Sequence, residues 1–126
     1  MTGPAVLVAD DDDLLRRLVQ RVLEADGVRV LPAADGDQAL AAVADPAQGV
    51  TVVVLDLVMP PYDGDETVRR MLAVRPGIGL LLTSGLPPDA GVSALLAAHG
   101  GVFLRKTFPP QALRSAVADL LARGGA

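Results

Sequence analysis

Residues 52–64 read VVVLDLVMPPYDG. The stretch opens with aliphatic, mostly β-branched residues, which is typical of a strand buried on both faces of a parallel sheet. Asp56 follows directly, and the segment after Met59 has the proline and glycine content of a turn. The pattern predicts a central strand that carries a carboxylate to its C-terminal edge, where parallel α/β sheets bind ligands. A lone aspartate there is equally typical of a loop or a helix cap. Whether Asp56 has a functional role therefore depends on which residues stand at the other strand ends.

Apolar runs and helical stripes alternate along the rest of the chain. Helices are expected to begin near residues 14, 36, 64, 88 and 110, and strands at 5–9, 28–31, 50–55, 78–82 and 102–104. This alternation predicts an α/β fold with a five-stranded parallel sheet, right-handed crossovers and helices on both faces. On the first helix, the periodicity predicts an inward face of Leu14, Leu15, Leu18, Val19, Val22 and Leu23.

Length and composition indicate one domain over residues 1–126, with a core of about residues 5–122. Hydrophobic residues make up 51% of the chain and aromatic residues 2%, so the core is expected to be aliphatic. The chain has no cysteine, no apolar run of the roughly 18–20 residues that cross a bilayer and no cluster of basic residues; its net charge is −4. We therefore expect a cytoplasmic protein that contacts neither membrane nor nucleic acid directly.

Charged and hydroxyl side chains follow four of the predicted strands. Asp10 and Asp11 follow the first strand and Asp56 ends the third. If these strands are neighbours, three carboxylates meet, and their mutual repulsion would be relieved by a cation. Oxygen ligands without histidine or cysteine suit a hard ion such as Mg²⁺. An alternative is that the acidic run caps the first helix, a role that we assign to Asp12 and Asp13.

The fourth and fifth strands add hydroxyls and a cation. Thr83 and Ser84 end the fourth strand, and Lys106 follows the fifth. Lys106 is the only lysine among 11 basic residues, which favours a specific role. A carboxylate nucleophile, a metal pocket, an ammonium and a hydroxyl are what phosphoryl transfer to an aspartate requires, because that reaction depends on positioning and charge neutralisation.

Four short stretches stand at these strand ends in a fixed order. They are VADDD (8–12), LDLVMP (55–60) with DG (63–64), LTSG (82–85) and FLRKTF (103–108). Together, at this spacing, they resemble the receiver domain of response regulators in two-component signal transduction, over about residues 5–122. The resemblance implies the flavodoxin-like receiver fold with strand order 2-1-3-4-5, and hence the strand adjacency assumed above.

The resemblance also implies roles for individual residues. Asp56 matches the phosphoacceptor, and Asp10, Asp11 and the Val58 carbonyl match the Mg²⁺ ligands. Lys106 matches the lysine that contacts the phosphoryl oxygen. Ser84 matches the switch hydroxyl, with Thr83 as the alternative, and Phe103 matches the rotating aromatic residue. Such a domain catalyses its own phosphorylation and dephosphorylation rather than turning over a separate substrate.

The implied partners are a sensor histidine kinase or a histidine phosphotransfer protein. The surface of the fourth helix, fifth strand and fifth helix would change shape on phosphorylation and could support a homodimer. The sequence leaves open whether the chain stands alone or belongs to a hybrid kinase or larger regulator.

One departure from the family pattern is Thr107, where the family usually has proline after its lysine in a cis peptide. A cis bond without proline is rare, so the loop either is trans and differs, or is cis despite the threonine. This residue favours an alternative function, a pseudo-receiver that binds partners without phosphorylation. A dehalogenase-type phosphatase would need a second aspartate where Val58 stands.

Overall fold

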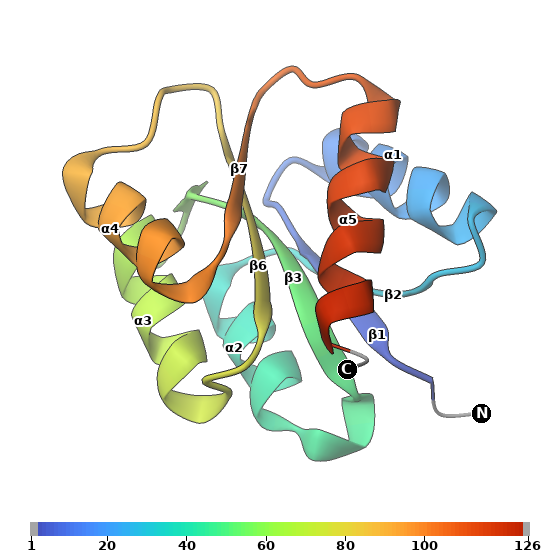
Figure 1. The fold of residues 1–126 in the computed structure, drawn as a ribbon, viewed down its shortest axis with the longest axis horizontal. Helices are drawn as coiled ribbons and strands as arrows, with labels where there is room; N and C mark the ends of the chain where they lie inside the picture. Colours follow the sequence, from blue (N-terminus) through green and yellow to red (C-terminus); the bar gives the residue numbers. More distant parts are fainter. Residues whose placement is uncertain (1–2, 125–126) are drawn as a thin grey trace.

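The computed structural model describes residues 3–124 and contains a five-stranded parallel sheet (Figure 1). Its strands are β1 (Ala5–Ala9), β2 (Arg29–Ala33), β3 (Val50–Asp56), β6 (Gly79–Ser84) and β7 (Val102–Arg105). They lie in the order β2-β1-β3-β6-β7. Counted along the chain among themselves, this is the expected 2-1-3-4-5, and the α/β fold with its parallel sheet is confirmed.

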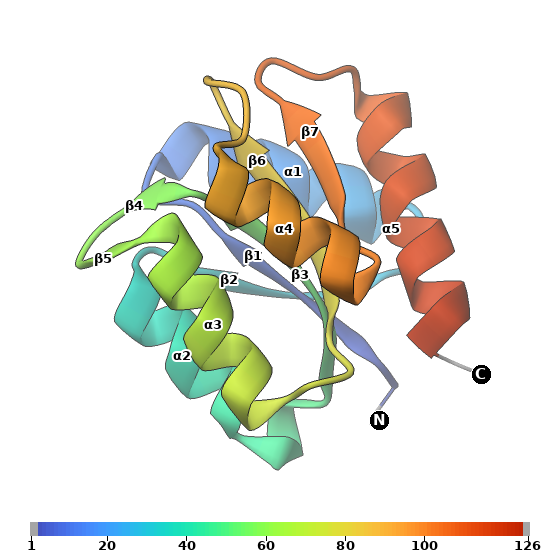
Figure 2. The ribbon, with the colours of Figure 1, turned by 60° about the vertical axis from the view of Figure 1, so that its left-hand side comes forward.

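Helices cover both faces of the sheet. One face carries α1 (Asp13–Ala25) and α5 (Pro110–Gly124), and the other carries α2 (Gly36–Ala44), α3 (Gly64–Val74) and α4 (Ala90–His99), as Figures 1 and 2 show from two directions. Within residues 3–124, none of these helices combines the length and apolar character that crossing a bilayer requires.

The central strands explain why the sequence reads as continuous apolar runs. Every residue of β1 is buried, and all of β3 except Thr51 is buried. Along β3, Val53 and Leu55 pack toward α2, α3 and α4, whereas Val52 and Val54 pack toward α1 and α5. Because alternate residues face opposite layers and both layers are apolar, polar side chains are confined to the strand ends.

The structure differs from the sequence-based expectation between β3 and α3. A short antiparallel pair, β4 (Val58–Met59) and β5 (Tyr62–Asp63), lies there, and the Pro60–Pro61 peptide that joins the two strands is cis. We expected only a turn, because two-residue strands beside a proline pair carry no periodic pattern. This β4–β5 hairpin begins two residues after Asp56 and therefore adjoins the polar edge of the sheet.

The predicted inward face of the first helix is wrong at two positions. Val19 and Leu23 are buried as expected, but Leu14 is 69% exposed and Leu18 is 49% exposed. Leu14 and Leu18 are four residues apart and therefore lie on one line along α1, whereas Val19 and Leu23 form the adjacent, buried line. Their neighbours Leu15 and Val19 nevertheless pack on the core, so Leu14 and Leu18 lie at the edge of the apolar stripe. Periodicity predicts which side of a helix is apolar, but not how much of the width of that side the sheet covers.

The close approach of Leu57, which follows β3, to the first residue of α3 yields a prediction about Gly64. A Cβ atom at this residue would lie 2.6 Å from the Leu57 carbonyl oxygen and 2.9 Å from the Leu57 Cα, so the backbone itself would have to move. We expect Gly64→Ala to lower the free energy of unfolding by about 1–3 kcal/mol, as overpacking does. Urea denaturation followed by circular dichroism would measure this loss.

Gly77→Ala is the matched control for this substitution. A Cβ at Gly77 would have no atom within 4 Å, and its φ is not in the left-handed region. Its free energy of unfolding should therefore stay within about 0.5 kcal/mol of the parent. Equal stabilities for the two variants would contradict the steric argument.

Candidate metal centre

Three carboxylates converge at the C-terminal edge of β1 and β3. The two strands are hydrogen-bonded neighbours, with Ala9 opposite Leu55, so the residues that follow meet at one edge. One oxygen from each of Asp10, Asp11 and Asp56 can be chosen so that all three lie within 4.8 Å of one another. Asp10 and Asp56 are buried, and Asp11 is exposed. An oxygen set of this kind, half open to solvent, fits the ligand preference of Mg²⁺ for carboxylates and water.

Lys106 lies against two of these carboxylates. Its Nζ donates to Asp10 Oδ2 at 3.1 Å and to Asp56 Oδ2 at 3.0 Å, and its side chain is only 19% exposed. The Lys106 backbone N–H donates to the Ser84 carbonyl at 2.8 Å, which extends the β6–β7 ladder by one step and fixes where the lysine leaves the sheet. The Lys106–Thr107 peptide is cis, which answers the question that Thr107 left open.

Backbone amides hold the second oxygen of each buried carboxylate. The Val58 N–H donates to Asp56 Oδ1 at 3.0 Å, and the Asp12 N–H donates to Asp10 Oδ1 at 2.9 Å. Each carboxylate is therefore oriented from both sides, by an amide on one oxygen and by Lys106 on the other. Asp12 also accepts the Leu15 N–H at 3.1 Å and so caps α1, as expected.

Burial and charge oppose each other in this cluster. Burial raises the pKa of Asp56 above its ordinary value, although the Val58 amide and the Lys106 ammonium both act to lower it. For Lys106, burial alone would lower the pKa, but the hydrogen bonds to Asp56 and Asp10 outweigh it and the pKa is raised. The lysine therefore stays charged at neutral pH, while the ionised form of Asp56 is disfavoured until further positive charge arrives.

Thr83 and Ser84 are both buried at the end of β6, but they lie on opposite faces of the sheet. Thr83 follows Leu81 on the α1 and α5 side, and its hydroxyl donates to the Leu55 carbonyl at 3.5 Å. Ser84 follows Leu82 on the α2–α4 side, where Phe103 also packs. Ser84 Oγ accepts the Leu86 N–H at 3.1 Å. Of the two hydroxyls, Ser84 is the one that shares a face with Phe103.

The structure adds contacts that sequence reasoning missed. Arg16 on α1 donates through Nη1 to the Asp10 carbonyl at 2.8 Å and through Nη2 to Asp13 at 2.6 Å, which anchors the acidic turn to the helix. Its only sequence signal is a basic residue three positions after Asp13. Farther out, Tyr62 contacts Asp37 and Arg70 from two other elements, and no local pattern indicates this arrangement.

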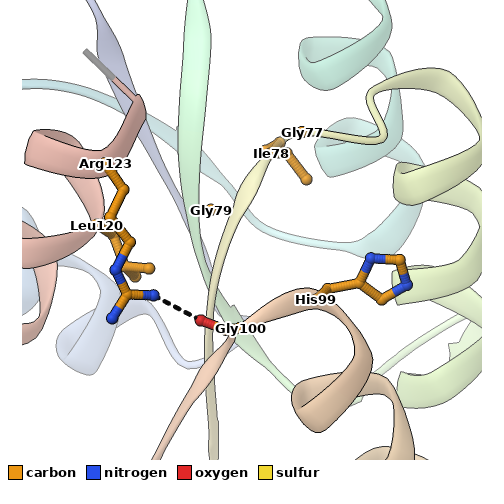
Figure 3. A pocket seen from close by; sticks show the side chains of 7 residues that line it. All are labelled: Gly77, Ile78, Gly79, His99, Gly100, Leu120 and Arg123. Carbon is orange, nitrogen blue, oxygen red and sulfur yellow. Dashed lines mark hydrogen bonds between the residues drawn. The ribbon is translucent and has the colours of Figure 1, made fainter. Parts of the chain in front are cut away.

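A hollow lies at the opposite end of the strands, and none of the three carboxylates lines it. It is formed where β6 begins and where α4 and α5 end, around Gly77, His99, Leu120 and Arg123 (Figure 3). Arg123 Nη1 donates to the Gly100 carbonyl at 2.7 Å, whereas the His99 ring points away from Arg123 (Figure 3). The two basic side chains do not converge, so the hollow has no anion-binding geometry.

The sequence of this chain matches a family of known proteins over most of its length. A family model described as the response regulator receiver domain matches residues 6–118. The transcriptional regulatory protein AruR of Pseudomonas aeruginosa is 35% identical over 123 residues, covering 95% of this chain and 50% of AruR. The sensor kinase CckA of Brucella abortus is 34% identical over 122 residues, covering 96% of this chain and 13% of CckA.

A solved structure agrees with these sequence matches. The crystal structure of the receiver domain from the hybrid histidine kinase CckA is 26% identical, with a TM-score of 0.77, and the match covers 93% of this chain and 98% of that one. The chain spans half or less of the length of AruR and of CckA. The activities of the whole AruR and CckA proteins therefore cannot be assigned to these 126 residues.

The raised pKa of Asp56 predicts how metal-free stability depends on pH. Because its pKa is higher in the folded than in the unfolded chain, the contribution of Asp56 is fully present below the ordinary carboxyl pKa and is lost as pH rises through the folded value. Asp56→Asn cannot ionise, so the variant does not lose stability as pH rises. In EDTA at pH 7.5 the variant should therefore unfold at a higher temperature than the parent, as thermal scans between pH 4 and 8 would show.

Asp13→Asn is the control for the removal of a negative charge. Asp13 is exposed, and its hydrogen bond to Arg16 lowers its pKa, so neutralising it should not raise the unfolding temperature. If Asp56→Asn melts below the parent at pH 7.5 in EDTA, burial is not the dominant influence on Asp56.

The carboxylate cluster also predicts Mg²⁺ binding. Asp11→Asn should weaken Mg²⁺ at least about tenfold, because it removes one of three ligand carboxylates. Asp13→Asn, two residues away on the same acidic run, should leave the dissociation constant within about twofold because exposed charges are screened. Isothermal titration of both variants would test this, and equal affinities would remove Asp11 from the ligand set.

Proposed function

The chain belongs to the response regulator receiver domain family, and we propose that it accepts a phosphoryl group on Asp56 within a two-component system. Receiver domains interact with histidine kinases and phosphotransfer proteins, so the donor would be a phosphohistidine on one of these. The observation that carries the proposal is the Lys106 ammonium bridging Asp10 and Asp56 beside Asp11. We also propose that residues 5–122 form the receiver unit and that it acts in the cytoplasm.

In the proposed reaction, an Asp56 carboxylate oxygen attacks the donor phosphorus. A P–O bond forms as the P–N bond to the histidine breaks, and the electron pair leaves on the imidazole nitrogen. The Val58 amide on Oδ1 keeps one carboxylate oxygen fixed, which leaves Oδ2, now bonded to Lys106, as the attacking atom. Lys106 would then shift from the carboxylate to a phosphoryl oxygen, which carries the charge after transfer.

Asp10, Asp11, Asp56 and the Val58 carbonyl would hold Mg²⁺, with Asp10 acting through water. When bound, Mg²⁺ supplies positive charge that offsets the repulsion between the carboxylates and the incoming phosphoryl group. The support for this assignment is the donor set itself: the three carboxylates lie close together, and Lys106 contacts two of them. One ammonium offsets only one of three negative charges.

We propose Ser84 as the hydroxyl that bonds the new acyl phosphate, with Thr83 as the alternative. Ser84 would exchange its present bond with the Leu86 amide for one to the phosphoryl group. Phe103 would fill the space that Ser84 vacates, because both lie on the α2–α4 face. The surface of α4, β7 and α5 would then change and select partners, including a second copy of the chain, as a population shift between two states.

A second function, a pseudo-receiver that binds partners without phosphorylation, is favoured by one residue. Thr107 stands where the family usually has proline. The complete set of acidic residues and lysine argues against the pseudo-receiver. Burying an ammonium between two carboxylates costs free energy, and phosphoryl chemistry gives a reason for that cost. The two functions differ in one observable, a covalent adduct on Asp56.

We predict that acetyl phosphate with Mg²⁺ adds one phosphoryl group to the wild-type chain and none to Asp56→Asn. Lys106→Ala should still bind Mg²⁺ but accept the phosphoryl group about 100-fold more slowly, because it loses a preorganised charge. Intact-mass spectrometry over time would measure both results. Asp13→Asn should react like the parent.

Two outcomes would change this assignment. An adduct that persists in Asp56→Asn would move the acceptor to another residue. Normal Mg²⁺ binding without an adduct, from acetyl phosphate or from any histidine kinase tried, would favour the pseudo-receiver.

A further inference from the structure

The β4–β5 hairpin is tied to α2 and α3 by the side chain of Tyr62. Its hydroxyl donates to Asp37 Oδ1 on α2 at 2.7 Å. The guanidinium of Arg70 on α3 lies 4.1 Å from the centre of the Tyr62 ring, at cation–π distance. Figure 2 shows the hairpin beside the beginnings of these two helices. One side chain therefore joins the hairpin to both α2 and α3.

The backbone beside Tyr62 is also fixed to α2. The Gly36 N–H, at the start of α2, donates to the Pro60 carbonyl at 2.8 Å. A Cβ at Gly36 would lie 3.1 Å from Tyr62 Cδ2 and 3.4 Å from Pro60 O, so glycine permits the close contact. The tip of the hairpin is thus seated on the N-terminus of α2 by a backbone bond, a side-chain bond and close packing.

The other end of the hairpin reaches the carboxylate cluster. In the β4–β5 ladder Met59 pairs with Tyr62 and Val58 pairs with Asp63. The Val58 N–H donates to Asp56 Oδ1 at 3.0 Å, and Val58 itself is 66% exposed. Its neighbours in the chain are anchored, because the Leu57 N–H donates to the Thr83 carbonyl at 2.9 Å and Met59 is buried in the core. Tyr62, which pairs with Met59 in the ladder, is therefore one of the contacts that hold the hairpin and with it the Val58 backbone.

We propose that Tyr62, held by Asp37 and Arg70, is a positioning residue for the Mg²⁺ site: it fixes the Val58 backbone, and through the Val58 amide it fixes the Asp56 carboxylate. The inference rests on the proposed function only in taking Asp10, Asp11 and Asp56 as the Mg²⁺ site. Phosphorylation of Asp56 is not required for it.

Two variants remove the Tyr62–Asp37 hydrogen bond from either side. Tyr62→Phe keeps the ring against Arg70 and loses only the hydroxyl, and Asp37→Ala loses the acceptor. Each should raise the Mg²⁺ dissociation constant about tenfold, at the lower end of what outer-shell substitutions do in metal sites. The double variant should be no weaker than either single one, because both remove the same bond.

Two controls separate positioning from charge and from general destabilisation. Asp37→Asn loses the charge but keeps a carbonyl acceptor, so its Mg²⁺ affinity should stay within about twofold of the parent. Arg69→Gln breaks the ion pair that Arg69 makes with Asp65 at 2.8 Å, on α3, and leaves the contacts of Tyr62 in place. This variant should not change the Mg²⁺ affinity.

A second readout needs no metal. In EDTA, hydrogen exchange of the Val58 amide should quicken about tenfold in Tyr62→Phe and Asp37→Ala, while amides of β1 and β3 keep their protection. This result would stand even if Asp56 proved not to accept a phosphoryl group. Unchanged Mg²⁺ affinity and Val58 exchange in both variants would overturn the proposal, as would an Asp37→Asn variant as weak as Asp37→Ala.

Discussion

The repulsion among three carboxylates, partly offset by one ammonium, constrains the whole polar edge of the sheet. Lys106 follows β7, yet it bonds to Asp10, which follows β1, and to Asp56, which ends β3. Its four-carbon stem must therefore pass the end of β6, which lies between β3 and β7. The chain has Thr83, Ser84 and Gly85 at that point, all small enough to let the stem pass. Lys106 is 50 residues from Asp56 and 96 residues from Asp10 in sequence. Its contacts with them thus require both this strand order and small residues at the end of β6.

Much of the fold could be predicted because its core strands are buried on both faces and so read as unbroken apolar runs. The positions of Asp10, Asp56 and Lys106 could be predicted for the same reason, since polar residues are tolerated only where such runs end. That the strands carrying Asp10 and Asp56 are neighbours could not be read from the runs, and came from the resemblance to a family. A strand carries no local mark of which strand lies beside it.

Other features have no local signature at all. The β4–β5 hairpin is too short for periodicity, and the exposure of Leu14 and Leu18 depends on how α1 is rotated against the sheet. The Tyr62–Asp37 bond joins residues 25 positions apart. In sequence, Tyr62 reads as a turn residue and Asp37 as a favourable charge in the first turn of a helix. Only the packing of the hairpin tip on α2, which the absence of a side chain at Gly36 permits, brings the two together.

The division of the polar edge between the two faces of the sheet bears on how a signal could leave the site. Asp56 lies in register with Thr83, and its strand neighbours Val52 and Val54 face α1 and α5. Ser84 and Phe103 lie on the other face, with α2, α3 and α4. A charge change at Asp56 would be felt directly by Lys106 and by the Val58 amide of the β4–β5 hairpin, which contacts α2 and α3. A group that extends beyond the carboxylate is needed to engage Ser84, because it must reach past the edge of the sheet. On this reasoning, a cation at the carboxylates would act through Lys106 and the hairpin, whereas a phosphoryl group on Asp56 would in addition reach Ser84, which shares a face with Phe103 and α4.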